Sequence, residues 1–214
     1  MRPLRFALAL GLLLNDALAA LRAIGFDVSG ISPGGRRLVV GGGEIEFVLA
    51  RPSDIATYVE RGAADLGIVG KDVLLESEAR VIELVDLGFG ACRFVVAAPR
   101  GAVERSLDEY RHLGTLEVAT KYPNVAERHF RARDIAVEIV KVAGSAEVAP
   151  LVGLADWIVD LVATGSTLRA NGLAVIDEIA SSTARLVANP ASYQLRRREI
   201  APVVERLAAW AATR

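Results

Sequence analysis

Residues 156–172 read Asp-Trp-Ile-Val-Asp-Leu-Val-Ala-Thr-Gly-Ser-Thr-Leu-Arg-Ala-Asn-Gly, the pattern of a strand, a loop and the start of a helix. The apolar run at 157–162 predicts a buried strand that carries Asp160 near its end. The loop that follows can direct several backbone N–H groups and three hydroxyls at one point, and a helix N-terminus adds partial positive charge, so the loop suits a phosphate group. The alternative is a threonine-capped helix after a buried strand, with no ligand.

Asp160 gives this loop a second chemical property. A carboxylate does not bind phosphate, but it accepts hydrogen bonds from sugar hydroxyls. The loop lacks the Gly-Lys-Ser/Thr of a Walker A loop and the GxGxxG pattern of a dinucleotide-binding turn, so neither of those nucleotide sites is expected.

Outward from this stretch, apolar segments of strand length alternate with helical patterns, which predicts an α/β fold with strands covered by helices. The order indicates two α/β lobes with mixed, mostly parallel sheets, and clefts between lobes are the usual place for a ligand. We expect lobe I to comprise residues 1–90 plus about 175–214, and lobe II residues 91–174 with the loop. The expected strands are 37–40, 44–50, 65–69, 81–84, 93–98, 116–120, 136–142, 157–162, 174–179 and 184–188, and the expected helices are 52–61, 71–77, 124–133, 146–151 and 196–212.

The composition excludes several classes of protein. The 214 residues have a net charge of −1, which argues against holding nucleic acid by bulk positive charge. Cys92 is the single cysteine, so an intramolecular disulfide and a site of several thiolates are excluded, and a reducing compartment is expected. The apolar run at 6–14 resembles the apolar region of a secretory signal, but a buried strand that leads into a helix explains it better. No apolar run approaches the ~20 residues that span a bilayer.

Several further segments point to one family. Together with the loop, they resemble ATP phosphoribosyltransferase, the first enzyme of histidine biosynthesis, in the same order and almost continuously from about residue 44 to residue 192. These segments are Asp54–Val59, Gly62–Asp72, Asp86–Arg93, Ala119–Asn124, Gly144–Glu147 and Ala149–Asp156.

The resemblance implies a fold of two lobes like a type II periplasmic binding protein, with the active site in the cleft between them. It also implies a reaction in which N1 of ATP displaces pyrophosphate from C1 of phosphoribosyl diphosphate, with Mg²⁺ carried by the substrate and no metal ligand certain in the protein. Glu147 and Asp160 are then the catalytic residues, because acids near the sugar stabilise the positive charge that develops on the ribose. Phosphoribosyl diphosphate is expected to bind Asp160, Thr164, Gly165, Ser166, Thr167 and Leu168, and ATP or diphosphate to bind Gly11, Arg51, Lys71, Arg93, Lys121 and Tyr122.

Each basic candidate also has a structural interpretation. Arg51 and Arg93 can pair with nearby acids such as Asp54 or Asp86, and Lys71 can begin a helix as a solvated charge. Tyr122 can stack on adenine or serve as a core ring.

The sequence departs from the family at residues 8–12, where Leu-Ala-Leu-Gly-Leu replaces the usual Leu-Pro-Lys-Gly-Arg. Two cations are missing, and each charge-assisted contact to phosphate contributes about 1.5–3 kcal/mol, so binding is expected to weaken by ~10² to 10⁴. Two alternatives therefore stay open: a catalytically impaired member of the family, and a non-catalytic module of the same fold that binds a small anion. The pair of acids beside the loop argues against a simple anion binder.

The resemblance also implies partners. The length matches the short form of the family, which works with a regulatory subunit resembling histidyl-tRNA synthetase. We therefore expect a homodimer alone, a hetero-octamer with that partner, and a cytoplasmic location, with no role for nucleic acid or a membrane.

Overall fold

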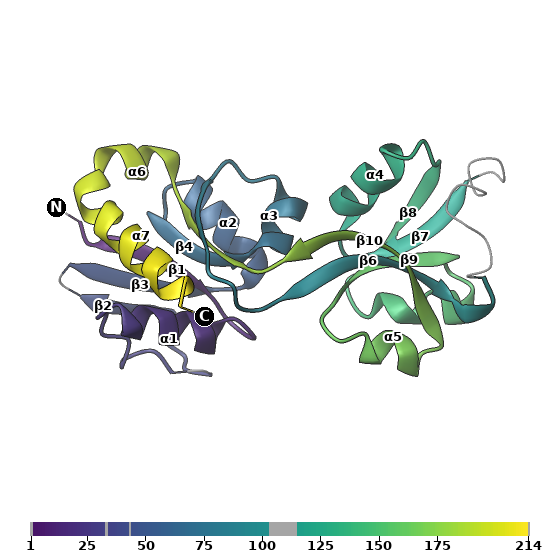
Figure 1. The fold of residues 1–214 in the computed structure, drawn as a ribbon, viewed down its shortest axis with the longest axis horizontal. Coiled ribbons are helices and arrows are strands. Elements are labelled where there is room, and N and C mark those ends of the chain that lie inside the picture. Colours follow the sequence, from purple (N-terminus) through teal and green to yellow (C-terminus); the bar gives the residue numbers. More distant parts are fainter. Residues whose placement is uncertain (1, 33, 43, 103–114, 214) are drawn as a thin grey trace. The chain divides into compact units, whose positions relative to one another are not determined.

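Two mixed β-sheets organise the chain, one in each of two structural units (Figure 1). The computed structural model describes residues 2–32, 34–42, 44–102 and 115–213. Unit 1 contains the residues up to Ala91 and those from Thr183 onward, and unit 2 is Cys92–Ser182. Among the described residues, no helix combines the length and the apolar character needed to cross a membrane.

The sheet of unit 1 is built around parallel strands. β1 pairs in parallel with β3 and β4, whereas β11, which the chain adds after leaving unit 2, lies antiparallel between β4 and β5. β1, β3, β4 and β5 therefore run in one direction, and β2 and β11 run against them. The strand order is β2-β3-β1-β4-β11-β5, with bounds β1 (Leu4–Ala9), β2 (Val39–Gly42), β3 (Ile45–Ala50), β4 (Leu66–Gly70), β5 (Ile82–Asp86) and β11 (Ala184–Ala188).

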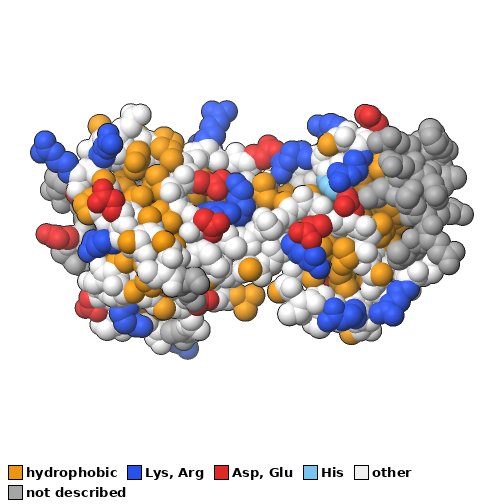
Figure 2. Space-filling view, viewed as in Figure 1, with side chains coloured by type: hydrophobic (Ala, Val, Ile, Leu, Met, Phe, Trp, Pro, Cys, Tyr) orange, Lys and Arg blue, Asp and Glu red, His pale blue; other side chains and the backbone are white. Residues whose placement is uncertain are grey.

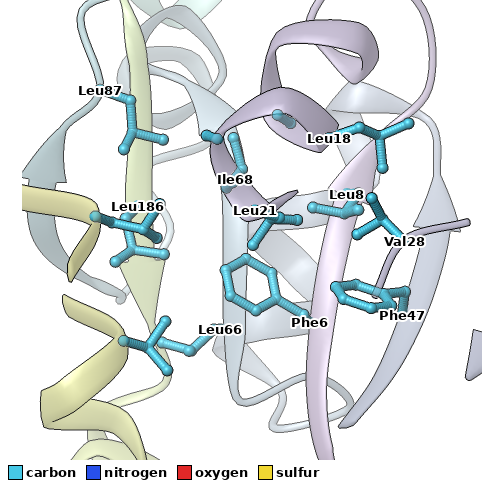
Figure 3. Close-up of a cluster of buried hydrophobic side chains, with 14 of the residues drawn as sticks. Phe6, Leu8, Leu18, Leu21, Val28, Phe47, Leu66, Ile68, Leu87 and Leu186 are labelled. Atoms are coloured by element: carbon cyan, nitrogen blue, oxygen red, sulfur yellow. The ribbon is translucent and has the colours of Figure 1, made fainter. Parts of the chain in front are cut away.

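Helices cover both faces of this sheet, which explains why β1 is apolar and buried at every position except Arg5. Successive strand residues point to opposite faces, so Phe6 and Leu8 join a core with α1 and α7, while Ala7 and Ala9 join a core with α2. Figure 3 shows the first core around Phe6 and Leu8. The helices of unit 1 are α1 (Leu14–Ala23), α2 (Pro52–Glu60), α3 (Lys71–Ser77), α6 (Pro190–Leu195) and α7 (Arg197–Ala211).

A buried carboxylate ties the ends of unit 1 together. Asp65, just before β4, is 0% exposed and accepts hydrogen bonds from both terminal nitrogens of Arg2 at 2.8 Å and from the Arg5 N–H at 2.9 Å. Ser192 Oγ donates to it at 2.7 Å and Arg196 Nη1 at 3.0 Å. Burial alone raises the pKa of Asp65, but the hydrogen bonds from Arg5, Ser192 and Arg2 outweigh it, so the pKa lies below its usual range.

The sheet of unit 2 has the order β10-β6-β9-β7-β8. β9, β7 and β8 are parallel neighbours, and β10 runs in the same direction because it is separated from β9 by the antiparallel β6. The elements of unit 2 are β6 (Cys92–Pro99), η1 (Arg100–Ala102), β7 (Leu116–Thr120), α4 (Pro123–Arg131), β8 (Val137–Lys141), η3 (Ala146–Val148), η4 (Pro150–Val152), β9 (Trp157–Val162), α5 (Ser166–Ala170) and β10 (Leu173–Ser182).

A buried histidine joins α4 to β10. His129 Nε2 lies 3.2 Å from Asp177 Oδ2, and Arg133 Nη1 lies 2.9 Å from His129 Nδ1. Burial is the largest effect on this imidazole and Arg133 adds to it, so the pKa of His129 is lowered despite the opposing effect of Asp177.

Three elements differ from the sequence-based expectation. Residues 175–182, expected in lobe I, continue β10 and pair with β6 in unit 2, because the strand is longer than its apolar centre suggested. The helix expected at 146–151 is two 3₁₀ turns, with Pro150 at the start of the second. The C-terminal helix starts earlier, at Pro190, and is interrupted at Arg196.

Candidate active site

The loop after β9 forms one side of a pocket of about 240 Å³ in unit 2. Glu147 reaches it from η3 and Asp160 from β9. Every residue that the sequence analysis assigned to phosphoribosyl diphosphate lines this pocket. The lining residues are Glu147, Asp160, Leu161, Val162, Ala163, Thr164, Gly165, Ser166, Thr167 and Leu168.

The loop has a backbone that glycine makes possible. Gly165 has φ +72°, in the left-handed region, and is the residue immediately before α5. The Thr164 and Ser166 hydroxyls lie 3.1 Å apart, and Arg169 Nη1 donates to the Thr164 carbonyl at 3.0 Å. The first amides of a helix have no acceptor within it, so the loop offers N–H groups to an anion. The strand, loop and helix are also what the alternative without a ligand predicts. The structure shows in addition a pocket that is lined by two acids.

Asp160 is a buried acid at this pocket, 5% exposed. Its Oδ1 accepts the Leu161 N–H at 2.8 Å and lies 3.6 Å from Lys121 Nζ. Burial raises the pKa of Asp160 most, and the charge of Glu147 raises it further. The Leu161 hydrogen bond and Lys121 oppose this effect without cancelling it, so the net pKa is raised.

Lys121 and Tyr122 lie where β7 ends and α4 begins. The Lys121 ammonium faces Asp160 and also lies 5.9 Å from the centre of the Tyr122 ring. Tyr122 packs edge to face on the buried Phe94 with ring centres 4.9 Å apart. Tyr122 therefore makes the contact expected of a core ring, although the residue is only partly buried.

Three predicted phosphate-binding positions lie along one sheet edge in unit 1. Gly11, Arg51 and Lys71 come just after β1, β3 and β4, three adjacent parallel strands, and the carboxyl ends of parallel strands are where ligands bind in open α/β sheets. Gly11 has φ +98° in an exposed turn, and Arg51 is exposed immediately before α2. Lys71 pairs with Glu83.

Arg93 is engaged by an acid that the sequence analysis did not select. Its Nη1 lies 2.6 Å from Glu178 on the neighbouring β10, and both side chains are about half exposed. Asp86, one of the partners considered for it, instead pairs with Arg185 and accepts a hydrogen bond from Thr183. The partner of Arg93 was not predictable because it lies 85 residues away in the chain.

The altered segment at residues 8–12 divides between core and solvent. Leu10 packs against the core of unit 1, whereas Leu12 is 97% exposed. An arginine at position 12 would therefore lose no packing, but a lysine at position 10 would.

Thr120 and Arg169 are two contributors that the sequence analysis did not assign. Both occur in segments that resemble the family, but a hydroxyl at a strand end and a helical arginine have no distinctive local pattern. Thr120 is fully buried and hydrogen-bonded on both sides, and Arg169 holds the loop from outside.

Comparison with known proteins identifies the family. A sequence model of ATP phosphoribosyltransferase matches residues 51–209. The ATP phosphoribosyltransferase of Rubrobacter xylanophilus is 52% identical over 200 residues, covering 94% of this chain and 93% of the relative.

Solved structures agree on the fold. A chain of the ATP phosphoribosyl transferase (HisG:HisZ) complex from Thermotoga maritima is similar with a TM-score of 0.84 and 33% identity, covering 99% of this chain and 100% of that one. The periplasmic aliphatic sulphonate binding protein of Escherichia coli has a TM-score of 0.62 at 13% identity, covers 99% of this chain and 69% of that one, and supports the two-lobe fold alone. ATP phosphoribosyltransferase is a pentosyltransferase of histidine biosynthesis. The chain belongs to the ATP phosphoribosyltransferase family.

Proposed function

We propose that the pocket of unit 2 holds the ribose 5-phosphate part of phosphoribosyl diphosphate. The observation that carries this proposal is the meeting of a phosphate-type loop with Glu147 and Asp160 in one pocket. At about 240 Å³ the pocket is smaller than the ~300–1,000 Å³ of typical drug-sized sites, so it suits part of one substrate. The diphosphate and ATP then lie outside it.

In this arrangement the loop takes the 5-phosphate. The N–H groups of Thr167 and Leu168 are early amides of α5, and Thr164 and Ser166 add hydroxyl donors. Gly165 lets the backbone turn toward the anion, and Arg169 keeps the loop closed through the Thr164 carbonyl.

Glu147 and Asp160 serve the ribose. As pyrophosphate leaves C1, positive charge develops on the sugar ring in the transition state, where nearby carboxylates stabilise it. Both acids accept hydrogen bonds from the ribose hydroxyls, which fixes C1 toward the incoming N1 of adenine. That nitrogen carries a lone pair and needs no base to activate it, so the acids are not required to remove a proton.

Cations are needed where the diphosphate leaves. Mg²⁺ enters as part of the substrate, on the diphosphate, where it neutralises the charge of the leaving group. Mg²⁺ commonly binds through substrate phosphates rather than in a dedicated protein cage. In the part of the chain that the structure describes, no three His, Cys, Asp or Glu side chains are grouped to hold a metal. Lys121 is the basic side chain that we assign to the diphosphate.

We further propose that this chain assembles with a regulatory subunit resembling histidyl-tRNA synthetase, as a hetero-octamer in the cytoplasm, and forms a homodimer alone. The complex from Thermotoga maritima supports the assembly with a second subunit. On the face drawn in Figure 2, basic side chains lie among acidic ones, which agrees with a protein rather than a nucleic acid as partner. Full turnover by the chain alone, inhibited by histidine, would contradict the need for the partner.

The decisive experiment is calorimetric titration of phosphoribosyl diphosphate with Mg²⁺, followed by ATP, into wild type, Asp160→Asn and Asp156→Asn. Asp156 immediately precedes β9, lies outside the pocket and is the matched control. We expect micromolar binding of phosphoribosyl diphosphate that disappears in Asp160→Asn and persists in Asp156→Asn. In a separate assay, Asp160→Asn should lower turnover at least tenfold, because an oriented donor or charge at a developing ion is typically worth a few kcal/mol. Wild-type kinetics in Asp160→Asn would remove its catalytic assignment.

A second titration separates the enzyme from a small-anion module. Ribose 5-phosphate should bind at least tenfold more tightly than inorganic phosphate, because Glu147 and Asp160 repel a bare anion, whereas ribose hydroxyls donate hydrogen bonds to them. Equal affinity for the two ligands would favour the anion module. Absence of binding by folded chain, with or without the regulatory subunit, would favour the impaired member of the family.

A further inference from the structure

Thr120 joins two strands of unit 2 through a buried hydroxyl. It is the last residue of β7 and is 0% exposed. Its Oγ1 donates to the Val159 carbonyl at 2.7 Å and accepts the Tyr122 N–H at 2.9 Å. The hydroxyl thus connects the backbone of β9 to the backbone of the turn after β7.

This connection lies where the strand pairing ends. The parallel ladder between β7 and β9 pairs Val118 with Trp157 and stops with Thr120 opposite Val159. The next residue of each strand is a site residue, Lys121 after β7 and Asp160 within β9. The hydroxyl of Thr120 therefore ties Tyr122, two residues past the end of the ladder, to Val159 of β9.

Just beyond this connection, the charged side chains of Lys121 and Asp160 contact each other. Lys121 Nζ lies 3.6 Å from Asp160 Oδ1, with the Lys121 side chain 35% exposed. Glu147 on η3 is the other charged group that acts on Asp160, and it opposes Lys121. On β6, the residue paired with Asp160 is the apolar Val95, and on α5 the guanidinium of Arg169 is bonded to the loop carbonyl. Among these facing groups, Lys121 is the cation that offsets Glu147.

We propose that Thr120 is a positioning residue for the transfer reaction, because its hydroxyl holds the Lys121 ammonium against the Asp160 carboxylate. The inference rests on the proposed function of the pocket. Without the hydroxyl, the turn at Lys121 and Tyr122 is no longer tied to β9. Asp160 then keeps the Leu161 N–H but loses the cation that offsets Glu147. A carboxylate that loses a nearby cation while an acid stays close becomes harder to ionise.

The test compares Thr120→Val, which removes the hydroxyl at nearly constant shape, with Thr120→Ser, which keeps it. The readout is the pH profile of kcat/KM for phosphoribosyl diphosphate, in the complex with the regulatory subunit where the chain alone is poorly active. We expect the acidic limb of Thr120→Val to move upward by roughly one pH unit, which is about a tenfold loss below that limb, with less than about a threefold loss on the plateau. Thr120→Ser should keep the wild-type profile.

Lys121→Gln shows whether the effect passes through the lysine. It should move the acidic limb in the same direction, and Thr120→Val combined with Lys121→Gln should move it no further than Lys121→Gln alone. An unchanged limb in Thr120→Val, additive shifts in the double variant, or a Thr120→Ser profile like that of Thr120→Val would each overturn the proposal.

Two further measurements keep the outcome decisive. If Thr120→Val does not fold, Thr120→Ala replaces it. If neither variant folds while Thr120→Ser does, the hydroxyl is needed for folding itself, and the proposal is overturned. Titration of the Asp160 carboxyl by NMR on aspartate-labelled protein needs no turnover, and the Asp160 pKa should be higher in Thr120→Val than in wild type. A wild type without turnover contradicts the proposed function, whereas equal carboxyl titrations contradict only the role of Thr120.

Discussion

Replacement of Asp65 by asparagine tests whether the buried carboxylate holds unit 1 together. The change keeps the shape but leaves two arginines without their shared counter-ion. The Arg2 side chain is 45% exposed, so its pair is screened and contributes about 0–1 kcal/mol. The Arg196 side chain is 13% exposed, and removal of one partner of a buried pair costs about 3–5 kcal/mol. Arg196 retains Glu199, which places the expected loss near the lower limit, about 3 kcal/mol.

At about 2–4 °C per kcal/mol for a chain of this length, the midpoint of unit 1 should fall by about 6–12 °C. The two tryptophans allow each unit to be followed separately, because Trp157 lies in β9 of unit 2 and Trp210 in α7 of unit 1. In a Trp157→Phe background, the fluorescence of Trp210 reports unit 1. In a Trp210→Phe background, Trp157 reports unit 2 and should show the smaller shift.

Glu199→Gln is the matched control, since it removes a partly exposed partner of Arg196 and should cost less than about 1 kcal/mol. The folded-state pKa of Asp65 is lowered, so its contribution is complete at neutral pH and is lost as the pH falls through that pKa. The difference between wild type and Asp65→Asn should therefore be constant between about pH 5 and 8 and shrink below about pH 4. A Trp210 midpoint no lower in Asp65→Asn than in Glu199→Gln would refute the reasoning.

Three other changes test single features. Gly165→Ala should weaken phosphoribosyl diphosphate binding about fivefold to thirtyfold by calorimetry, since a left-handed non-glycine costs about 1–2 kcal/mol and its Cβ would lie 3.1 Å from Arg169 Nη1. Gly153→Ala, with φ +69° outside the pocket, should affect only stability, and equal binding losses in the two variants would refute the loop's role. Leu12→Arg should strengthen binding of phosphate-bearing substrates about tenfold or more with no change in thermal midpoint, because the side chain is 97% exposed, and no gain would mean that other cations already fill the role. Relative to His129→Gln, the free energy of unfolding of wild type should fall between about pH 7.5 and 5, because a histidine whose pKa is lowered by folding favours the folded state only while its ring is neutral. Parallel stability curves for the two proteins would contradict this.

The conformation of the loop after β9 was predictable because its information is local. A strand, a glycine that needs a left-handed backbone and a short helix are consecutive in the sequence, so Thr164–Leu168 were selected before the pocket was known. Glu147 was selected through its resemblance to the family, and the structure brings it to the same pocket. Its role and that of Asp160 stay predictions.

What the sequence did not reveal depends on pairing between distant residues. The end of β10 is decided by its ladder with β6, and the apolar pattern of residues 175–182 alone did not show which unit they join. Lys71 and Arg93 have acidic partners whose proximity is created by the fold, at Glu83 and Glu178. The fate of the altered first loop was equally hidden, because only packing separates a core leucine at position 10 from an exposed one at 12.

The pocket places two acids beside a loop that suits an anion, and this combination has an energetic cost that the other contacts of Asp160 partly offset. Burial and Glu147 both make Asp160 harder to ionise, so an isolated carboxylate at this position would tend to be protonated and lose its value to a cationic sugar. The Leu161 N–H and Lys121 offset part of that cost from two sides. A bare phosphate adds to the repulsion, whereas a ribose 5-phosphate brings hydroxyls that satisfy the same carboxylates. Under the proposed function, this electrostatic cost is therefore a source of selectivity for a phosphorylated sugar over its phosphate alone.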